Sequence, residues 1–460
     1  MPAPSEVPGR MAVRLISLPN VHFNASPRVV AIFHWLPRAL LVAWVLTLPF
    51  EFTKVYFPNQ AFEVSRLVLV LCVLAFAGQI VLERTELRVP LTMSVLGLVL
   101  FTAFATVSAA ATGSVQGIKT AGSMVAYLLM MLIIFNVVRT YADHRLVWSA
   151  LALSAIVVAI VGLILYLTNS YIWNPPSVGI LRVNATFHDP NILARFLGIA
   201  MVTMVLLAAD MDVGVRQRAL WVAALLAAAV VIPITFSRAG WVFAFLVALS
   251  VIALARRRKP ALALVGSIVA IFAAVAIIDP LVLSRAALLA ENLESPFRNH
   301  AFLDRAPWLR FLEVLPLDSV RQYLVGSGLI MFADHPILGI GFGDFSQALR
   351  GPYAGLVPIG VDNTASHTSL VTILAETGLV GLAIVLITAV SFVRSSIRAT
   401  TQTGQARALV LAPVVGLLLI VLDSQLSGRL FEEPYLWLFL GLAYSAQAGV
   451  EEAVRRPSPA

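Results

Sequence analysis

The amino-acid sequence predicts an all-α polytopic membrane protein with about twelve transmembrane helices. Three observations lead to this fold class. Hydrophobic residues make up 60% of the 460 residues and charged residues only 12%, whereas soluble proteins carry about 25% charged residues. Apolar runs long enough to span a bilayer recur along the chain. All five short loops on one side of the predicted bilayer are basic, as the positive-inside rule requires.

The predicted spans are runs of roughly 17 to 25 mainly apolar residues. They cover residues 30–50, 64–82, 91–111, 119–138, 147–168, 191–209, 219–235, 239–255, 261–279, 367–391, 407–423 and 434–449. We therefore divide the chain into a cytoplasmic N-terminal tail, helices 1 to 9, a periplasmic lobe, helices 10 to 12 and a cytoplasmic C-terminal tail. The boundaries of these five parts are 1–28, 29–279, 280–366, 367–449 and 450–460.

Lysine and arginine residues set the orientation of the predicted helices. With a cytoplasmic N-terminus, all five short inner loops are basic, and the run Arg-Arg-Arg-Lys at 256–259 is the densest. The same count places the long segment 280–366 outside. Arginines in a long translocated domain have little influence on the orientation of the helices, so those in this segment do not contradict the assignment. The N-terminal tail lacks the apolar core of a signal peptide, so we expect the first helix to direct insertion. The single cysteine, Cys72, excludes an intramolecular disulfide.

Several cations fall in the predicted outer loops. Arg182 is the only arginine or lysine in the loop between helices 5 and 6. Arg238 lies in a hairpin too tight to leave it much freedom, which favours a positioned role. Arg195 falls about one turn inside the next helix, where a charge needs a partner or an aqueous cavity. We expect His188 and Asp189 to be polar partners of Arg195.

The long outer segment adds further candidates. Arg321 lies in the first turn of a predicted short helix. The glycines of the following run, 335–343, permit tight turns and close backbone approach to a ligand. His367 is placed at the start of the tenth helix, whose N-terminus favours a nearby anion and a neutral imidazole. Glu376 lies more than two turns further along, and we expect it to pair with a hydroxyl or an arginine in the bundle.

The motif content narrows the chemistry. The sequence has no serine nucleophile elbow, no His-Glu-x-x-His and no cysteine pair, so serine hydrolases and zinc enzymes have little support. The acidic pair Asp210 and Asp212 resembles a metal site of nucleotide-sugar transferases but stands alone in a short inner loop. An activated group outside the membrane must then be carried on a lipid. Outer arginines suit its diphosphate, and a histidine can deprotonate an incoming hydroxyl.

Five segments resemble the O-antigen ligase and polymerase superfamily of bacterial inner membranes. They are 181–191 (LRVNATFHDPN), 236–241 (FSRAGW), 335–343 (HPILGIGFG), 367–370 (HTSL) and 374–378 (LAETG). The resemblance implies a GT-C-like helical fold with a periplasmic lobe between helices 9 and 10. It also implies a metal-independent glycosyl transfer, without a cofactor, from an undecaprenyl-diphosphate-linked glycan.

The resemblance further implies roles for individual residues. His367 matches the position of the family's general base, and Arg182 and Arg238 match the arginines that bind the diphosphate. Arg321 precedes the glycine-rich run as a family arginine does. The Arg-rich stretch 281–316 departs from the family pattern and leaves the type of acceptor open.

The leading interpretation is a multi-pass inner-membrane ligase whose acceptor is a lipid A core sugar, with its active site facing the periplasm. The closest alternative is a polymerase of the same superfamily, which extends a growing lipid-linked glycan. A ligase to protein hydroxyls is a third variant. A transporter or lipid flippase would use the buried charges Arg195 and Glu376 along a pathway, and a purely structural scaffold is the simplest alternative. The predicted partners are these glycans and membrane lipids, and nucleic acid is not among them.

Overall fold

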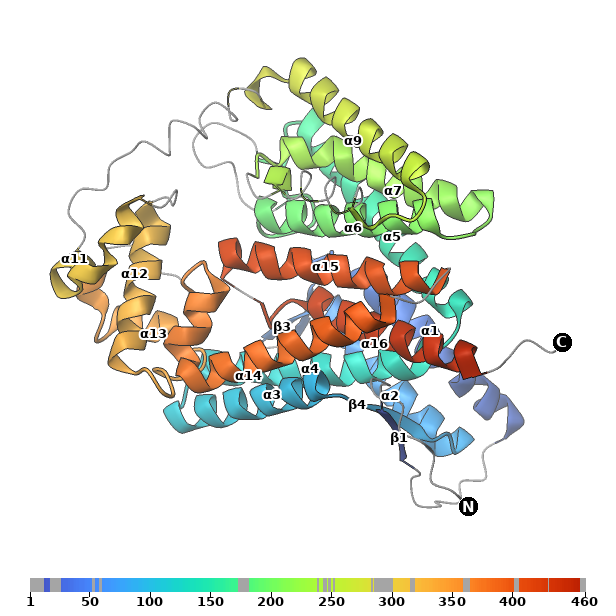
Figure 1. The fold of residues 1–460 in the computed structure, drawn as a ribbon, viewed down its shortest axis with the longest axis horizontal. Coiled ribbons are helices and arrows are strands. Elements are labelled where there is room, and N and C mark those ends of the chain that lie inside the picture. The colour runs from blue at the N-terminus through green and yellow to red at the C-terminus, as the bar shows by residue number, and fades with distance from the viewer. Residues whose placement is uncertain are drawn as a thin grey trace.

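The computed structural model of the protein describes residues 12–16, 26–51, 54–57, 60–172, 182–237, 240–242, 246, 250, 253–282, 284, 301–314, 319–358, 365–400, 405–428 and 430–455. These residues form a bundle of long helices with a small helical lobe at one end (Figure 1). Among them are ten helices long and apolar enough to cross a membrane, which confirms the predicted fold class. The ten are α1 (Pro27–Thr47), α2 (Val64–Glu83), α3 (Met93–Thr112), α4 (Val115–Val137), α5 (Tyr141–Leu167), α6 (Pro190–Asp210), α7 (Val215–Ile234), α9 (Arg258–Ile278), α14 (Ser369–Thr400) and α15 (Gln405–Ser427).

Two of the twelve predicted spans are not among these ten. The span predicted at 239–255 lies mostly outside the described residues. The span predicted at 434–449 forms helix α16 (Pro434–Arg455), in which aromatic and polar residues such as Gln447 lower the mean hydropathy. Residues 435–448 are all buried, so α16 lies inside the bundle rather than against lipid.

The centre of the bundle is formed by α6, α15 and α16. In α6, 94% of the membrane-span window is buried, against 17% in α9, so α6 is central and α9 peripheral. α15 packs against α6 on one side and against α14 and α16 on the other. These central helices position the loops that carry the candidate site residues.

The lobe lies between α9 and α14 in the sequence and at the left of Figure 1. It contains α11 (Ala301–Arg305), α12 (Ser319–Asp334), α13 (Phe345–Arg350) and two 3-10 helices, Pro307–Val314 and Ala354–Leu356. The lobe has a hydrophobic core of its own, which includes Leu309, Leu324, Met331 and Phe345. α12 packs against α14, so the lobe rests on the helix that follows it.

Contacts between loops divide the bundle into two ends. Strand β1 (Ala12–Ile16), in the N-terminal tail, pairs antiparallel with β4 (Leu87–Leu91), between α2 and α3. The carboxylate of Asp210, at the end of α6, accepts from the backbone N–H groups of Arg256 and Arg257, both at 2.9 Å. All these segments were predicted to be cytoplasmic, and we call this the inner end. The strand pair was not predicted, and Asp210 holds backbone amides rather than standing alone.

The segments predicted to lie outside also contact one another. The hydroxyl of Thr186 donates to the carbonyl oxygen of Pro49 (2.5 Å), and the carboxylate of Glu51 accepts from the backbone N–H of His188 (2.9 Å). Burial raises the pKa of the Glu51 carboxyl above its ordinary value, although the His188 N–H acts in the opposite direction. We call this the outer end. Strands β2 (Lys54–Phe57) and β3 (Gln60–Glu63) form a second small antiparallel pair between α1 and α2.

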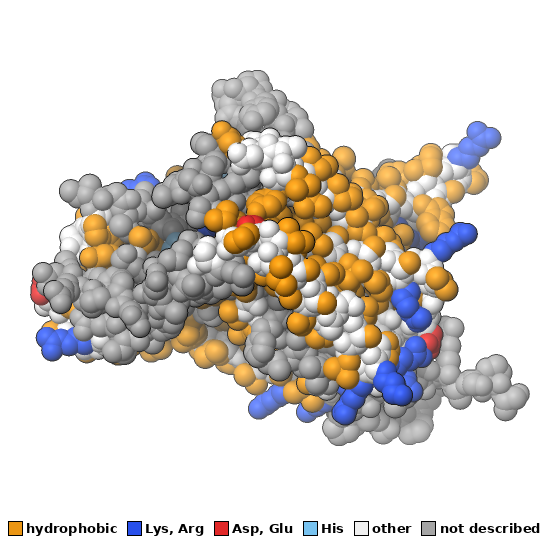
Figure 2. Space-filling view, turned by 90° about the horizontal axis from the view of Figure 1, so that it is seen from above, with side chains coloured by type: hydrophobic (Ala, Val, Ile, Leu, Met, Phe, Trp, Pro, Cys, Tyr) orange, Lys and Arg blue, Asp and Glu red, His pale blue; other side chains and the backbone are white. Residues whose placement is uncertain are grey.

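The surface follows the same division. Apolar side chains make up most of the described surface on the face seen in Figure 2, as a lipid-facing surface requires. Lys and Arg side chains gather at the end of the molecule that also holds both chain termini in Figure 1. This distribution agrees with the orientation inferred from the basic loops.

Candidate active site

Three of the outer segments that contain candidate site residues also contain a strained backbone conformation. Each contains one non-glycine residue with a positive φ: Ala185 (47°), Phe236 (51°) and His367 (60°). Such residues cost roughly 1–3 kcal/mol each and cluster at functional sites, where the surrounding structure holds them in place. The other two among the described residues, Arg84 and Asn169, lie at the ends of helices, where this conformation is common.

Arg182 joins its loop to two helices. Its Nε donates to the carbonyl oxygen of Thr235 (3.2 Å), and its Nη2 donates to Oδ1 of Asn191 (3.1 Å). Thr235 directly follows α7, and Asn191 lies in the first turn of α6. Arg238, three residues beyond Thr235, lies outside the described residues. Arg182 therefore lies beside the segment that leads to Arg238.

The buried arginine of α6 has partners other than those predicted. Arg195 forms ion pairs with Asp423 of α15 (2.8 Å) and with Glu433 in the loop before α16 (2.5 Å). The expected companions, His188 and Asp189, have other roles, because His188 is exposed and Asp189 is the N-cap of α6. The ion triplet ties α6 to the outer end of α15. A buried arginine between two carboxylates is what a structural anchor requires.

Helix α14 is broken at Gly378, and the glycine-rich run 335–343 repairs the break. The N–H groups of Leu379 and Val380 turn away from their own helix and donate to the carbonyl oxygens of Pro336 (2.8 Å) and Ile337 (3.2 Å). In return, the N–H groups of Ile340 and Gly341 donate to the freed carbonyl oxygens of residues 375 and 376 of α14 (2.9 and 3.2 Å). Irregular backbone at membrane depth is stable only where such partners are supplied.

Two glycines make this exchange possible. Gly378 has φ 61° and ψ −160°, which excludes a side chain, and a Cβ there would lie 2.3 Å from the carbonyl oxygen of Ile337. Gly339 has φ 73°, and a Cβ there would lie 2.3 Å from the carbonyl carbon of Glu376. We expected the glycines to let the backbone approach a ligand. They instead let it approach another backbone, and the continuous helix predicted at 367–391 is two helical pieces.

The carboxylate of Glu376 binds the backbone of the segment between the glycine-rich run and α13. Its Oε1 accepts from the backbone N–H of Phe345, at the start of α13 (3.2 Å), and the N–H of Gly343 contacts the same group. The expected hydroxyl or arginine partner is replaced by backbone amides. Arg195 and Glu376 therefore both have partners that connect separate segments of the bundle.

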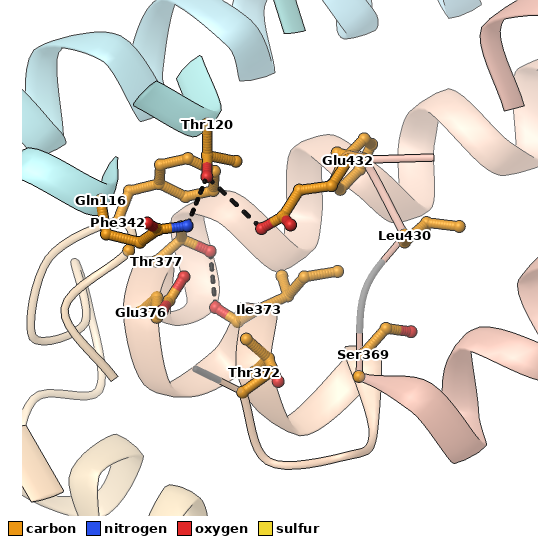
Figure 3. Close-up of a pocket in the computed structure, with 14 residues that line it drawn as sticks. Gln116, Thr120, Phe342, Ser369, Thr372, Ile373, Glu376, Thr377, Leu430 and Glu432 are labelled. Carbon is orange, nitrogen blue, oxygen red and sulfur yellow. Dashed lines mark hydrogen bonds between the residues drawn. The ribbon is translucent and has the colours of Figure 1, made fainter. Parts of the chain in front are cut away.

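A pocket with about 570 Å³ of empty space, part of it open to solvent, lies beside Glu376 (Figure 3). Four parts of the chain form its walls: the start of α4, the end of the glycine-rich run, the first turns of α14, and the loop between α15 and α16. Its polar lining residues include Gln116, Thr120, Ser369, Thr372, Glu376 and Glu432. Figure 3 shows Glu432 reaching across from the loop towards Thr120, whose hydroxyl donates to its Oε1 (3.4 Å).

His367 lies at the edge of this pocket in the sequence and in space. It is partly exposed and falls between two lining residues, Ala365 and Ser369. Its backbone packs against a third, Gly428, where a Cβ would lie 2.8 Å from the His367 nitrogen. The neighbouring Thr368 donates its hydroxyl hydrogen to the carbonyl oxygen of Gln425, at the end of α15 (3.3 Å). His367 thus precedes α14 by two residues and is fixed to α15.

His367 and Arg182 lie at the same end of the bundle, with α15 between them. His367 packs against the end of α15, whereas Arg182 is bonded to α6, on the other side. The ion triplet of Arg195 connects the two sides. Arg321 lies apart from both in the sequence, near the start of α12 in the lobe, where it is partly buried.

The α15–α16 loop and the start of α4 did not emerge from the sequence as parts of a site. The sequence showed only that the loop carries charges of both signs. Its consecutive acids, Glu432 and Glu433, reach different helices, because Thr120 of α4 binds one and Arg195 of α6 binds the other. The two adjacent carboxylates in a short outer loop were the feature of the sequence that could have indicated this part of the site.

Comparison with known proteins agrees with this architecture. The family model described as O-Antigen ligase matches residues 223–386, which run from α7 through the lobe and the glycine-rich loop into α14. No curated protein matches the chain. Members of the matched family are glycosyltransferase-like membrane enzymes. Residues 223–386 therefore match an O-antigen ligase domain, which supports a place for the chain in the O-antigen ligase and polymerase superfamily.

Proposed function

We propose that the protein transfers a glycan from undecaprenyl diphosphate to an acceptor hydroxyl, with a lipid A core sugar as the acceptor. The reaction takes place at the periplasmic face of the bacterial inner membrane, which corresponds to the outer end of the bundle. The family match and the gathering of strained, polar segments at that one end support this function. The reaction needs no metal ion or cofactor, because arginines balance the charge of the leaving diphosphate.

His367 is the general base of the proposed reaction. The acceptor oxygen attacks the anomeric carbon of the donor, the bond from that carbon to the diphosphate oxygen breaks, and the hydroxyl proton passes to the imidazole. The positive φ of His367 is the observation that carries the assignment, because strained backbone is kept where function needs it. Its place just before α14 favours a neutral imidazole, since the amide groups of a helix start disfavour a cation.

The arginines bind the diphosphate. Guanidinium groups match phosphate oxygens in pairs and stabilise the negative charge that the leaving group gains. Arg182 is held beside the segment that leads to Arg238, so these two form the main diphosphate site. Arg321, near the start of α12 in the lobe, is the third arginine of the proposed diphosphate site.

The test is transfer by purified variants in detergent, with rough lipopolysaccharide as acceptor and an undecaprenyl-diphosphate-linked glycan as donor. His367→Ala should lower kcat by about 10²- to 10⁴-fold, the usual contribution of a general base. The matched control is His34→Ala, which removes an exposed imidazole paired with Glu83 at the inner end and should leave kcat unchanged. Normal turnover by His367→Ala would reject the base.

Incubation with the donor alone separates the two branches of the superfamily. A ligase leaves the lipid-linked glycan at its original length until rough lipopolysaccharide is added. A polymerase lengthens the lipid-linked glycan in the absence of any other acceptor. Lengthened glycan in the donor-only reaction therefore assigns the protein to the polymerases.

A further inference from the structure

The strained backbone of His367 is held by the residues on either side of it. The hydroxyl of Ser366 donates to the carbonyl oxygen of Thr368 (2.8 Å), so one hydrogen bond spans His367. The N–H of Ser366 donates to the hydroxyl of Thr372, in the first turn of α14 (3.1 Å). A left-handed residue persists only where the surrounding structure fixes it. The position of His367 therefore depends on how the first turn of α14 is itself held.

Gln425, near the end of α15, holds that first turn. Its Oε1 accepts from the backbone N–H of Leu370 (3.3 Å), and its Nε2 donates to the hydroxyl of Ser369 (2.6 Å). Its backbone carbonyl oxygen accepts from the hydroxyl of Thr368 (3.3 Å). The first N–H groups of a helix have no acceptor within that helix, so Gln425 caps α14 from its neighbour. An amide suits this task because it offers an acceptor and donors together.

The last residues of α15 also approach His367 directly. Gly428 has φ 76°, and its N–H donates to the carbonyl oxygen of Ser424 (2.9 Å). This turn brings Gly428 so close that a Cβ on it would lie 2.8 Å from the nitrogen and 2.9 Å from the Cα of His367. The hydroxyl oxygen of Ser424 lies 2.8 Å from that of Ser369, which adds another link between the two helices. The end of α15 therefore fixes both His367 and the turn that follows it.

We propose that Gln425 is a positioning residue for His367, which fixes the start of α14 and with it the direction of the imidazole. The inference rests on the proposed function and adds to it the group that orients the base. A general base must lie within hydrogen-bond reach of the proton that it takes. A displaced backbone at His367 lowers the rate of the chemical step and leaves the binding of both substrates intact.

The kinetics of Gln425→Met test this role, because methionine keeps the length of the side chain and removes both polar atoms. The kcat should fall roughly 10- to 100-fold, as expected for a small misplacement of a catalytic group, and KM should stay the same for the donor and for rough lipopolysaccharide. An unchanged kcat, or a rise in either KM that accounts for the loss of rate, would overturn the assignment.

Gln217→Met is the matched control. Gln217 of α7 is also partly buried and also joins two helices, because its Nε2 donates to the hydroxyl of Ser149 (2.5 Å) and to the carbonyl oxygen of Arg145 (3.3 Å), both in α5. These bonds lie at the inner end, so Gln217→Met should lower the melting temperature about as much as Gln425→Met and leave kcat unchanged. A similar fall in kcat for both variants would show that lost stability, and not the position of the base, is the cause.

A second substitution shows whether Gln425 acts through the base. In a His367→Ala background there is no imidazole to orient, so Gln425→Met should lower the residual rate no further. A residue that contacts a substrate or supports only the fold lowers the rate by the same factor in both backgrounds. Equal factors would overturn the positioning role.

Hydrogen exchange, measured by mass spectrometry, tests the same contact without turnover. Gln425→Met removes the acceptor of the Leu370 N–H, so peptides that cover residues 366–372 should exchange faster than in the wild-type protein. Gln217→Met should leave these peptides unchanged. Unchanged exchange of 366–372 in Gln425→Met would show that Gln425 does not hold the start of α14.

The two possible failures can be told apart. Normal turnover by His367→Ala rejects the proposed base, and the positioning role falls with it. A large loss of turnover in His367→Ala together with normal kcat in Gln425→Met rejects the positioning role alone and leaves the proposed function in place.

Discussion

Substitution of Gly378 by alanine should break the joint between α14 and the glycine-rich loop. A Cβ on Gly378 would lie 2.3 Å from the carbonyl oxygen of Ile337 and 2.7 Å from the nitrogen of Leu338, both backbone atoms that cannot rotate away. The residue also holds φ 61° and ψ −160°, a combination that is essentially confined to glycine. The loop must move outwards or α14 must straighten.

Either movement leaves two N–H groups without acceptors. If α14 straightens, its own N–H groups take back the carbonyl oxygens of residues 375 and 376, and Ile340 and Gly341 lose them. If the loop moves and the break is kept, Leu379 and Val380 lose the carbonyl oxygens of Pro336 and Ile337, and each unsatisfied buried donor costs about 1–3 kcal/mol. The backbone strain adds about 1–3 kcal/mol if the conformation is kept. The combined loss of roughly 3–9 kcal/mol is a large part of the 5–15 kcal/mol by which proteins are stable.

The measurement is the melting temperature of purified protein in detergent, read from the folded peak in size-exclusion chromatography after heating. Gly378→Ala should lower it by at least about 5 °C, in line with the estimated loss of stability. Gly122→Ala in α4 is the matched control, because no atom lies within 4 Å of the added Cβ and alanine favours a helix. Equal melting temperatures for the two variants would show that the exchanged hydrogen bonds do not hold the joint.

Three further predictions concern charged groups. Arg195→Met leaves Asp423 and Glu433 buried without their cation, so the free energy of unfolding should fall by about 3–5 kcal/mol, measured by thermal melting. Arg257→Ala removes an exposed ion pair at the inner end and should change the same quantity by less than about 1 kcal/mol. Because burial raises the pKa of Glu51, the folded state favours its protonated form, and stability is lost as pH rises from the unfolded value through the folded one. Glu51→Gln should remove this loss, so melting curves of the two proteins should diverge as pH increases above about 4.5.

The sequence predicted the features that depend on local composition. Apolar runs mark membrane helices because each span must be hydrophobic by itself, and the basic loops separate the two ends for the same reason. The sequence missed the break in α14, since the segment around Gly378 is apolar enough as a whole to be read as one continuous span. It also missed α16 as an interior helix, because burial depends on neighbours distant in the chain.

The sequence predicted individual candidate site residues but not their contacts in space. Arg182 and His367 were identified by motif, and the structure places both at the outer end. The partners of Arg195 could not be predicted, since Asp423 and Glu433 lie more than two hundred residues away in the sequence. The walls of the pocket come from α4, the glycine-rich run, α14 and the α15–α16 loop, and only the packing of these elements brings Thr120 to Glu432.

The exchange of hydrogen bonds between 335–343 and the break in α14 has a consequence for chimeric proteins. Each stretch supplies acceptors and donors that the other lacks, so neither is a self-sufficient module. A lobe transplanted from a relative should insert correctly only when the residues around Gly378 are transplanted with it. The two motifs, separated by about thirty residues, should therefore be inherited and engineered as a single unit.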